Sequence, residues 1–362
     1  KVAVKPKAKK KSKAQKQPSK DKKSTVSKGG AGKKKSDKKS KAAKGSLKSS
    51  YGKKKETVFH EKLFEAWDKP ELAFFFTGQQ RGYIEPCGCT GLANQKGGLM
   101  RRDTFLAQLQ KRGWNPLALD VGNQVRRHMR QAEIKFAMTA DALQRMNYRA
   151  VALGAKDVQL SFGELAAAVD PENKNSPFIC ANVHLLDTSP QYRIIQQGSR
   201  KIGITSVMSD RFAKAIISDI IEVEPAEKAL KRVTAKLKAE KCDVIVLLAQ
   251  ASLRETKELA KKFNDFDLIV TSGGAEEPAY EPETLTGNKA LLIQIGGKGM
   301  YVGVVGYYTD ANKKFRYQRA PLDSRFKDSV RMSKLFADYQ DQLKRLYPKG
   351  LDVRQRPHSS GN

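Results

Sequence analysis

From Glu71 onward, short apolar runs alternate with segments of helical periodicity, and this alternation constrains the fold more than any other feature of the chain. Such runs, separated by amphipathic helices, indicate βαβ units and a largely parallel sheet. Apolar positions that recur every four residues between residues 130 and 147 illustrate the helical pattern. The chain is therefore predicted to be an α/β protein.

The pattern places the expected elements in a definite order. Strands are predicted at 72–76, 117–120, 150–153, 178–181, 193–195, 202–207, 243–248 and 267–270, and the last two, at 291–295 and 301–308, look antiparallel. The segment between 195 and 202 reads as a hairpin-like turn. Helices are predicted at 62–67, 97–110, 130–147, 253–263 and 329–346, and Pro225 suits the first turn of another.

Positive charge is concentrated at one end of the chain. Residues 1–55 contain 23 lysines, no arginine and only two aspartates, within a chain of formal net charge +31. With almost no aromatic or branched apolar residues, this segment cannot bury enough surface to offset the entropy of ordering. We expect a disordered tail, acting either as an electrostatic arm for an anionic polymer or surface, or as a solvated spacer. Specific nucleic-acid binding is disfavoured because no base-reading motif accompanies the lysines.

The remaining chain is predicted to consist of a linker or short helix at 56–70, one domain at 71–310, and a C-terminal helix and linker at 311–362. Four cysteines are too few for a disulfide scaffold. No run approaches the roughly 18 apolar residues of a membrane span. The sequence starts at Lys1 without an initiator Met or an apolar signal core, so we expect that a targeting segment has been removed or that the chain is a fragment.

Candidate functional residues lie in loops, because chemistry in open α/β sheets takes place beyond the carboxyl ends of the strands. Five such loops follow the predicted strands. They read Thr-Gly-Gln-Gln-Arg-Gly at 77–82, Asp-Val-Gly-Asn at 120–123, Gly-Ala-Lys-Asp at 154–157, Ala-Gln-Ala-Ser at 249–252 and Thr-Ser-Gly-Gly-Ala at 271–275.

The order and spacing of these loops resemble the metallophosphoesterase superfamily, in particular its secreted 5′-nucleotidase branch. The loops of that branch read Thr-Asn-Asp-x-His-Gly, Asp-x-Gly-Asp, Gly-Asn-His-Glu, Leu-Ser-His-x-Gly and Gly-His-x-His. Segments 181–183 and 294–303 resemble its framework, and the resemblance covers about residues 71–310. It implies an α/β/β/α sandwich and, in ordinary members, a dinuclear metal site that hydrolyses phosphoesters.

The positions that hold the metals in that family carry other residues in this chain, namely Gln79, Arg81, Asn123, Ala155, Lys156 and Gln250, with Gly273 and Ala275 in the last loop. Carboxylate and imidazole ligands offset the charge of two cations, whereas amides bind metal weakly and basic side chains repel it. We therefore expect no dinuclear metal centre. A mononuclear variant using Asp120 or Asp157 is an alternative, although Asp120 is expected to support its own loop.

An insertion in the first loop carries Cys87 and Cys89, separated by one glycine. The two thiols could bind a soft metal or cycle between dithiol and disulfide. The structural alternative is a loop disulfide or two packed thiols. A four-cysteine metal site is disfavoured, because Cys180 ends a predicted strand whereas Cys242 begins one, which places them at opposite edges of the sheet.

A second candidate site follows the same insertion. Gly97 and Gly98 precede a predicted helix whose first turn contains Arg101 and Arg102. Glycine amides at a helix N-terminus bind anions well. The alternative interpretation is a tight turn with no ligand.

The Cys-Gly-Cys insertion, with its Gly-Gly-Leu-Met-Arg-Arg continuation, is also similar to the amino-terminal half of exported bacterial proteins, planctomycete ones among them, that continue into a multihaem cytochrome c region. Segment 354–362 resembles the linker before that region. The resemblance implies a periplasmic location and a cytochrome or envelope protein as partner. The 362 residues contain no Cys-x-x-Cys-His motif, so we expect no covalent haem in this chain, and no other cofactor is identified.

These features predict a non-hydrolytic metallophosphoesterase-like domain with a binding or assembly role at the cell envelope, linked to electron transfer. Two alternatives remain open. The chain could be a diverged metal-dependent phosphoesterase or 5′-nucleotidase-type hydrolase, or a thiol redox or metal-binding protein that uses Cys87 and Cys89.

Overall fold

The structure is a computed structural model that describes residues 62–88, 91, 94–127, 129–169, 176–185, 189–287, 290–309 and 314–348. The predicted lysine-rich tail at 1–55, Cys89 and the segment 354–362 lie outside the described residues. None of the helices within the described ranges combines the length and apolarity needed to cross a membrane.

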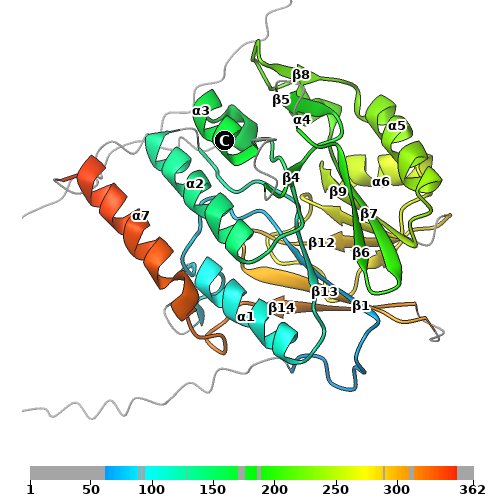
Figure 1. Cartoon of the computed structure of the whole chain (residues 1–362), viewed down its shortest axis with the longest axis horizontal. Helices are drawn as coiled ribbons and strands as arrows, with labels where there is room; N and C mark the ends of the chain where they lie inside the picture. Colours follow the sequence, from blue (N-terminus) through cyan, green and yellow to red (C-terminus); the bar gives the residue numbers. More distant parts are fainter. Residues whose placement is uncertain are drawn as a thin grey trace, which may run out of the picture. The chain divides into compact units, whose positions relative to one another are not determined.

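The first sheet has six strands in the order β14-β13-β1-β2-β3-β4 (Figure 1). Its parallel half comprises β1 (Leu72–Thr77), β2 (Leu117–Asp120), β3 (Ala150–Ala152) and β4 (Phe178–Ile179). The antiparallel half adds β13 (Tyr301–Tyr307) and β14 (Phe315–Pro321). Every residue of β1 is buried, as expected for a central strand that is covered on both faces.

The second sheet follows the order β11-β12-β10-β9-β7-β6. It consists of β6 (Tyr192–Gln197), β7 (Arg200–Met208), β9 (Val244–Gln250), β10 (Leu268–Thr271), β11 (Glu283–Thr284) and β12 (Leu291–Gln294). The hairpin between β6 and β7 is confirmed. The antiparallel interpretation of 291–295 is wrong for its main contact, because β12 runs parallel to β10 and only the two-residue β11 opposes it.

Helices cover the outer faces of the two sheets (Figure 1). On the first sheet lie α1 (Leu99–Lys111), α2 (Arg130–Arg145), α3 (Phe162–Val169) and α7 (Ser333–Leu346). On the second lie α5 (Ala226–Ala239) and α6 (Leu253–Lys262). Separate apolar cores fill the two helix–sheet layers and the space between the sheets. The predicted α/β/β/α sandwich is confirmed.

The layer between the sheets is built from the inward-facing half of each strand. In β1, Phe74 and Phe76 stack with ring centroids 5.8 Å apart and are fully buried. Phe75 points to the opposite face, where it contacts Phe105 of α1. This alternation follows from the two-residue period of a strand. Truncating one such phenylalanine to alanine costs about 3–5 kcal/mol of stability, so the position of the loop after β1 is firmly fixed.

Several short elements went unpredicted because they lack a periodic signal. These are α4 (Asp210–Ala213), β5 (Val183–Leu185), β8 (Ile221–Val223) and the 3₁₀ turns Asp157–Gln159 and Val330–Met332. The helix predicted at 62–67 is instead a turn, in which Phe64 and Ala66 have φ of 57° and 55°. The compact fold also continues past residue 310, because β14 pairs with β13 and α7 packs on the helical layer.

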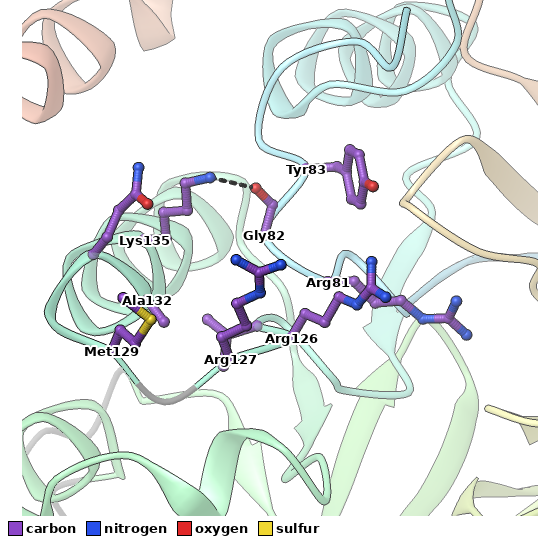
Figure 2. Close-up of a pocket in the computed structure, with 10 residues that line it drawn as sticks. Arg81, Gly82, Tyr83, Arg126, Arg127, Met129, Ala132 and Lys135 are labelled. Atoms are coloured by element: carbon purple, nitrogen blue, oxygen red, sulfur yellow. Dashed lines mark hydrogen bonds between the residues drawn. The ribbon is translucent and has the colours of Figure 1, made fainter. Parts of the chain in front are cut away.

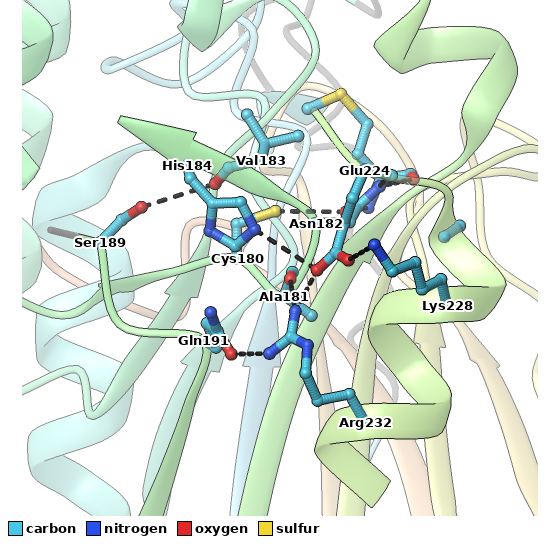
Figure 3. Close-up of polar contacts among 12 residues, drawn as sticks. Cys180, Ala181, Asn182, Val183, His184, Ser189, Gln191, Glu224, Lys228 and Arg232 are labelled. Carbon is cyan, nitrogen blue, oxygen red and sulfur yellow. Dashed lines mark hydrogen bonds and ion pairs between the residues drawn. The ribbon is translucent and has the colours of Figure 1, made fainter. Parts of the chain in front are cut away.

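The predicted framework segment at 181–183 joins the two sheets near β5 and β8 (Figure 3). Asn182 is fully buried, accepts from Met208 N at 2.9 Å and donates to Met208 O at 2.8 Å. Nearby, Glu224 forms an ion pair with Arg232 and lies 3.5 Å from His184 Nε2. A buried amide whose hydrogen bonds are satisfied in this way fixes the geometry of a core. This cluster therefore holds the framework together and is not the chemical site.

Candidate functional site

Three amide side chains from three of the predicted loops meet at the carboxyl ends of the parallel strands. Gln79, after β1, accepts from Asn123 Nδ2, after β2, at 3.2 Å. The same Asn123 Nδ2 lies 3.1 Å from Gln250 Oε1 at the end of β9. Gln250 donates in turn to Val121 O. We call Gln79, Asn123 and Gln250 the amide cluster. Sequence reasoning placed these positions together, and the structure brings them into contact.

The third predicted loop joins this cluster through its backbone. Lys156 N donates to Asn123 Oδ1 at 3.2 Å, while the Lys156 side chain is exposed. Ala155 packs at the edge of the helical core. A Cβ atom at Gly122 would lie 2.4 Å from Ala152 O, and one at Gly154 would lie 2.2 Å from Asn123 N. Glycine is therefore required where these loops cross.

The fifth loop closes the site from the second sheet. Gln79 Nε2 donates to Ser272 O at 2.5 Å. Gly273 packs against the backbone of residues 251–253, and Ala275 is exposed. Glu276, which the sequence did not single out, forms an ion pair with Arg81. It also lies 3.6 Å from Lys298 Nζ, on the loop between β12 and β13.

Left-handed backbone conformations occur at three of the positions where the resembled family has metal ligands. Gln79, Arg81 and Asn123 have φ of 52°, 50° and 60°. The left-handed region costs a non-glycine residue roughly 1–2 kcal/mol, and such residues gather at functional sites. The loops therefore keep left-handed backbone conformations, although amide and guanidinium side chains stand where the family has metal ligands.

Beneath the amide cluster lies a second polar group, which we call the buried arginine cluster. Arg102, from α1, is fully buried and donates to Gln80 Oε1, and it lies 3.5 Å from Asp120 Oδ2. Asp120 Oδ2 accepts from Thr77 Oγ1 at 2.5 Å, and its Oδ1 accepts from Gly122 N at 2.8 Å. Asp120 therefore supports the loop that follows it, and its oxygens face protein donors.

The anion site predicted at the start of α1 is not formed by the expected groups. Gly97 N donates to Leu322 O at 2.9 Å, and Arg101 donates to Gln95 O at 2.8 Å. Gly98 is the residue before the helix and packs against Pro86. Because Arg102 is turned into the interior, neither arginine is directed at an external ligand there. Gly97 and Gly98 form a turn.

Asp157 is also committed to structure. Its two oxygens accept from Val125 N and Gly154 N, each at 3.0 Å, and the side chain is fully buried. Burial raises the pKa of Asp157 to about 6, against the opposing effect of its backbone hydrogen bonds. This carboxyl therefore links the second and third loops through its two hydrogen bonds.

The cysteine loop contains an oxidised sulfur. Cys87 is buried and disulfide-bonded, and its backbone pairs with Lys96. Cys180 and Cys242 are free thiols, and burial raises the pKa of both. A disulfide sulfur has no thiolate charge to offer a metal. In this state Cys87 acts as a structural tie.

A cavity opens above the amide cluster, and we call it the cationic cavity. Its inner lobe, of about 410 Å³, is lined by Gln79, Arg81, Tyr83, Asn123, Val125, Arg126, Lys156, Glu276 and Lys298. Its outer lobe, of about 280 Å³, shares four of these residues and extends to Arg127, Met129, Gln131, Ala132 and Lys135 (Figure 2). The sequence identified four residues of the inner lobe as altered metal-ligand positions, namely Gln79, Arg81, Asn123 and Lys156. It did not single out Arg126 and Lys298, the other two basic residues of this lobe.

Basic side chains dominate this cavity. The lining of the two lobes includes one carboxylate, Glu276, and the basic residues Arg81, Arg126, Arg127, Lys135, Lys156 and Lys298. Lys135 donates to Gly82 O at 3.0 Å, and burial lowers its pKa below the usual value. Two adjacent arginines, Arg126 and Arg127, follow the second loop closely, and they are the sequence feature that could have predicted the positive charge of the cavity.

The donor set does not fit a divalent metal. Within the described ranges, no group of three or more His, Cys, Asp or Glu side chains is arranged to hold a metal ion. The amide cluster is neutral, and the basic residues around it would repel a cation. Metal centres of phosphoesterases depend on anionic and imidazole ligands. The arrangement is suited to holding an anion.

Comparison with known proteins places these loops in a wider context. No family model matches the chain. It is 24% identical over 225 residues to an apyrase from Aedes aegypti, covering 54% of this chain and 40% of the relative. It is 25% identical over 261 residues to a snake venom 5′-nucleotidase from Crotalus adamanteus, covering 66% and 43%. The chain thus spans less than half the length of these relatives.

Solved structures share the fold at low sequence identity. A 5′-nucleotidase precursor from Thermus thermophilus is similar with a TM-score of 0.65 and 19% identity, over 76% of this chain and 59% of that protein. The calcineurin-like phosphoesterase YfkN from Bacillus subtilis gives 0.57 and 15%, over 75% and 97%. The loops predicted from the sequence therefore lie on the architecture that they implied.

Proposed function

Because this chain has the fold of 5′-nucleotidases and is similar to them in sequence, we propose that it is a 5′-nucleotidase-like metallophosphoesterase that keeps the binding cleft of that fold without a hydrolytic metal centre. The observation that carries this proposal is the amide cluster, in which Asn123 donates to both Gln79 and Gln250 where the family has metal ligands. Hydrolysis in that family depends on metal-activated water. A site that favours anions over cations supports a function in ligand binding and not in metal-dependent hydrolysis.

The experiment is a combined metal and activity measurement on the full chain. Purified without chelator, it is expected to retain far less than one metal ion per chain. It should not hydrolyse 5′-AMP, ADP or bis(p-nitrophenyl) phosphate when Mn²⁺, Co²⁺ or Zn²⁺ is added. Two tightly bound metals together with phosphoester hydrolysis would contradict the proposal.

A matched variant shows whether the fold could still hold metal. Family ligand types are restored at the substituted positions with Gln79→Asp, Arg81→His, Asn123→Asp, Lys156→His and Gln250→His. This variant is expected to bind Zn²⁺ or Mn²⁺ where the parent does not, because carboxylates and imidazoles replace amides and cations. If both proteins bind metal equally, the substitutions do not explain the difference.

We also propose an extracytoplasmic role at the cell envelope, in binding or assembly with an electron-transfer partner. The disulfide at Cys87 supports the compartment, because such bonds persist in oxidising environments. The resemblance of the Cys-Gly-Cys loop to exported multihaem proteins supports the partner. Fractionation of the source cells is expected to recover the protein outside the cytoplasm with Cys87 oxidised. Recovery from the cytoplasm with a reduced thiol would reject the location.

A diverged hydrolase is the second candidate, and the printed names of the relatives, apyrase and 5′-nucleotidase, are what favour it. The activity measurement above separates it from the binding function. The thiol redox alternative is tested by replacing Cys87 and Cys89 with serine, since an unchanged reduction potential would remove it.

A further inference from the structure

Among the described residues that line the cationic cavity, six are basic and one is a carboxylate. We propose that it binds an organic molecule carrying two oxyanion groups, one in each lobe, in place of the metal centre. This inference rests on the binding function proposed above and names the ligand class of the same site. It draws on the charge, the partners and the shape of the cavity.

In the outer lobe, Arg126 and Arg127 have no acidic partner among the described residues, whereas Lys135 is attracted electrostatically to Glu85. Arg126 and Arg127 are exposed, and neither forms an ion pair or a side-chain hydrogen bond with another described residue (Figure 2). Lys135 is bonded to a neutral carbonyl, Gly82 O. Helix α2 begins at Arg130 beside this lobe, and its N-cap Met129 provides no capping side chain. Backbone amides at such a helix end add to the positive potential.

In the inner lobe, a carboxylate of the chain itself already occupies an anion position. Glu276 pairs with Arg81 and lies 3.6 Å from Lys298 Nζ. Its backbone is fixed, because Gly297 N donates to Glu276 O at 2.8 Å, but its side chain is half exposed. An incoming oxyanion could therefore take over both cations while Glu276 turns to solvent. Glu276 is expected to act as an internal competitor.

The shape of the cavity favours an extended ligand over a single inorganic ion. The lobes share Arg81, Tyr83, Val125 and Arg126 and therefore lie side by side, and we infer that one molecule reaches from one to the other. Tyr83 is partly exposed at this junction, and the exposed Met129 adds apolar surface in the outer lobe. Basic groups lie at both ends. A short organic body with an oxyanion at each end matches this order of polar and apolar surface.

The first test is titration calorimetry of the metal-stripped full chain in metal-free buffer, after the chelator, itself a polycarboxylate, has been removed by dialysis. The probes are fructose 1,6-bisphosphate and glutarate, which carry two phosphates and two carboxylates, with inorganic phosphate as the single-anion reference. At least one organic probe is expected to bind about tenfold or more tightly than phosphate, with an affinity that falls as salt is added. The better probe identifies phosphate or carboxylate as the preferred group. If neither organic probe binds more tightly than phosphate, the inference is overturned.

The second test uses charge variants with matched controls. Arg126→Gln is expected to lower affinity for the better probe about tenfold, the effect of one charge-assisted hydrogen bond. Glu276→Gln is expected to raise it several-fold. Arg254→Gln and Glu258→Gln change the same charges on α6, away from the cavity, where the two side chains lie 3.8 Å apart. These controls should leave affinity unchanged within about twofold, because distant surface charges are screened.

The outcomes separate this inference from the proposed function. Equal shifts in the cavity variants and the α6 controls would mean that only general surface charge is sensed, which overturns the inference. A metal-free, inactive chain that binds neither organic probe, even as Glu276→Gln, would leave the binding function standing and reject this ligand class. A metal-loaded, hydrolytic chain would reject both.

Discussion

Two polar groups lie at the same edge of the first sheet, and their surroundings differ. In the buried arginine cluster, Arg102 and Asp120 are fully enclosed and bonded to neighbouring side chains. In the cationic cavity, Arg126 and Lys156 are exposed, and basic groups outnumber the single carboxylate. A buried charge needs a partner, whereas an exposed one can await a ligand. The first group therefore maintains the fold, and the second is available for binding.

The largest expected effect is on the buried side of this comparison. Arg102→Met leaves Asp120 buried without its cation, and removing one partner of a buried pair costs about 3–5 kcal/mol of stability. Urea unfolding should show this loss, whereas Arg101→Met, at a partly exposed neighbour, should cost about 1 kcal/mol or less. Equal losses in the two variants would mean that Arg102 is not the structural member of the doublet.

Asp157 provides a pH test of the same idea, because burial raises its pKa to about 6. Between pH 4 and 6 the folded state holds this proton more firmly than the unfolded state does, so the stability contributed by Asp157 falls as pH rises. Asp157→Asn cannot titrate. The stability of the parent relative to this variant should therefore decrease by about 2 kcal/mol from pH 4 to pH 7.

Urea unfolding at several pH values measures this difference. Asp141→Asn, at an exposed aspartate paired with Arg145 on α2, serves as the control and should show a much smaller change. Parallel stability curves for the parent and Asp157→Asn would show that the pKa of Asp157 is not raised by burial in the folded state.

The smallest effect on stability is expected in the cavity. Lys156 is exposed and bonds through its side chain only to Gln159, at 3.3 Å, among the described residues. Lys156→Gln should change the free energy of unfolding by less than about 0.5 kcal/mol, yet lower affinity for the organic oxyanion about threefold. Calorimetry and urea unfolding of the same sample check both. A loss of stability without a loss of affinity would place Lys156 with the structural group.

The sequence predicted the fold well where periodicity is strong, and poorly where elements are short. The helix at 130–147 and the strand at 243–248 have clear apolar patterns, and both appear within a few residues of their predicted bounds. β5 and β8 have three residues each, too few for any period to register. The turn near Phe64 was mistaken for a helix because the positive φ values there leave no trace in composition.

For the site, the sequence predicted the amide cluster but not the residues that line the cavity around it. Gln79, Asn123 and Gln250 stand at motif positions, so their meeting could be anticipated. Glu276 and Lys298 come from loops whose approach depends on how the second sheet packs against the first, and spacing in one sequence does not encode that. Arg102 appeared to be an external anion ligand because its burial depends on the direction of one helix face.

One measurement tests the central claim most directly. The metal-stripped full chain is freed of chelator and divided into two portions in metal-free buffer, and one is titrated with Mn²⁺ while the other is titrated with the better organic oxyanion. We predict saturable binding of the oxyanion at one site per chain and no saturable binding of Mn²⁺. Tight binding of Mn²⁺ with no binding of the oxyanion would contradict the conclusion that this site has exchanged metal ligands for an anion-binding surface.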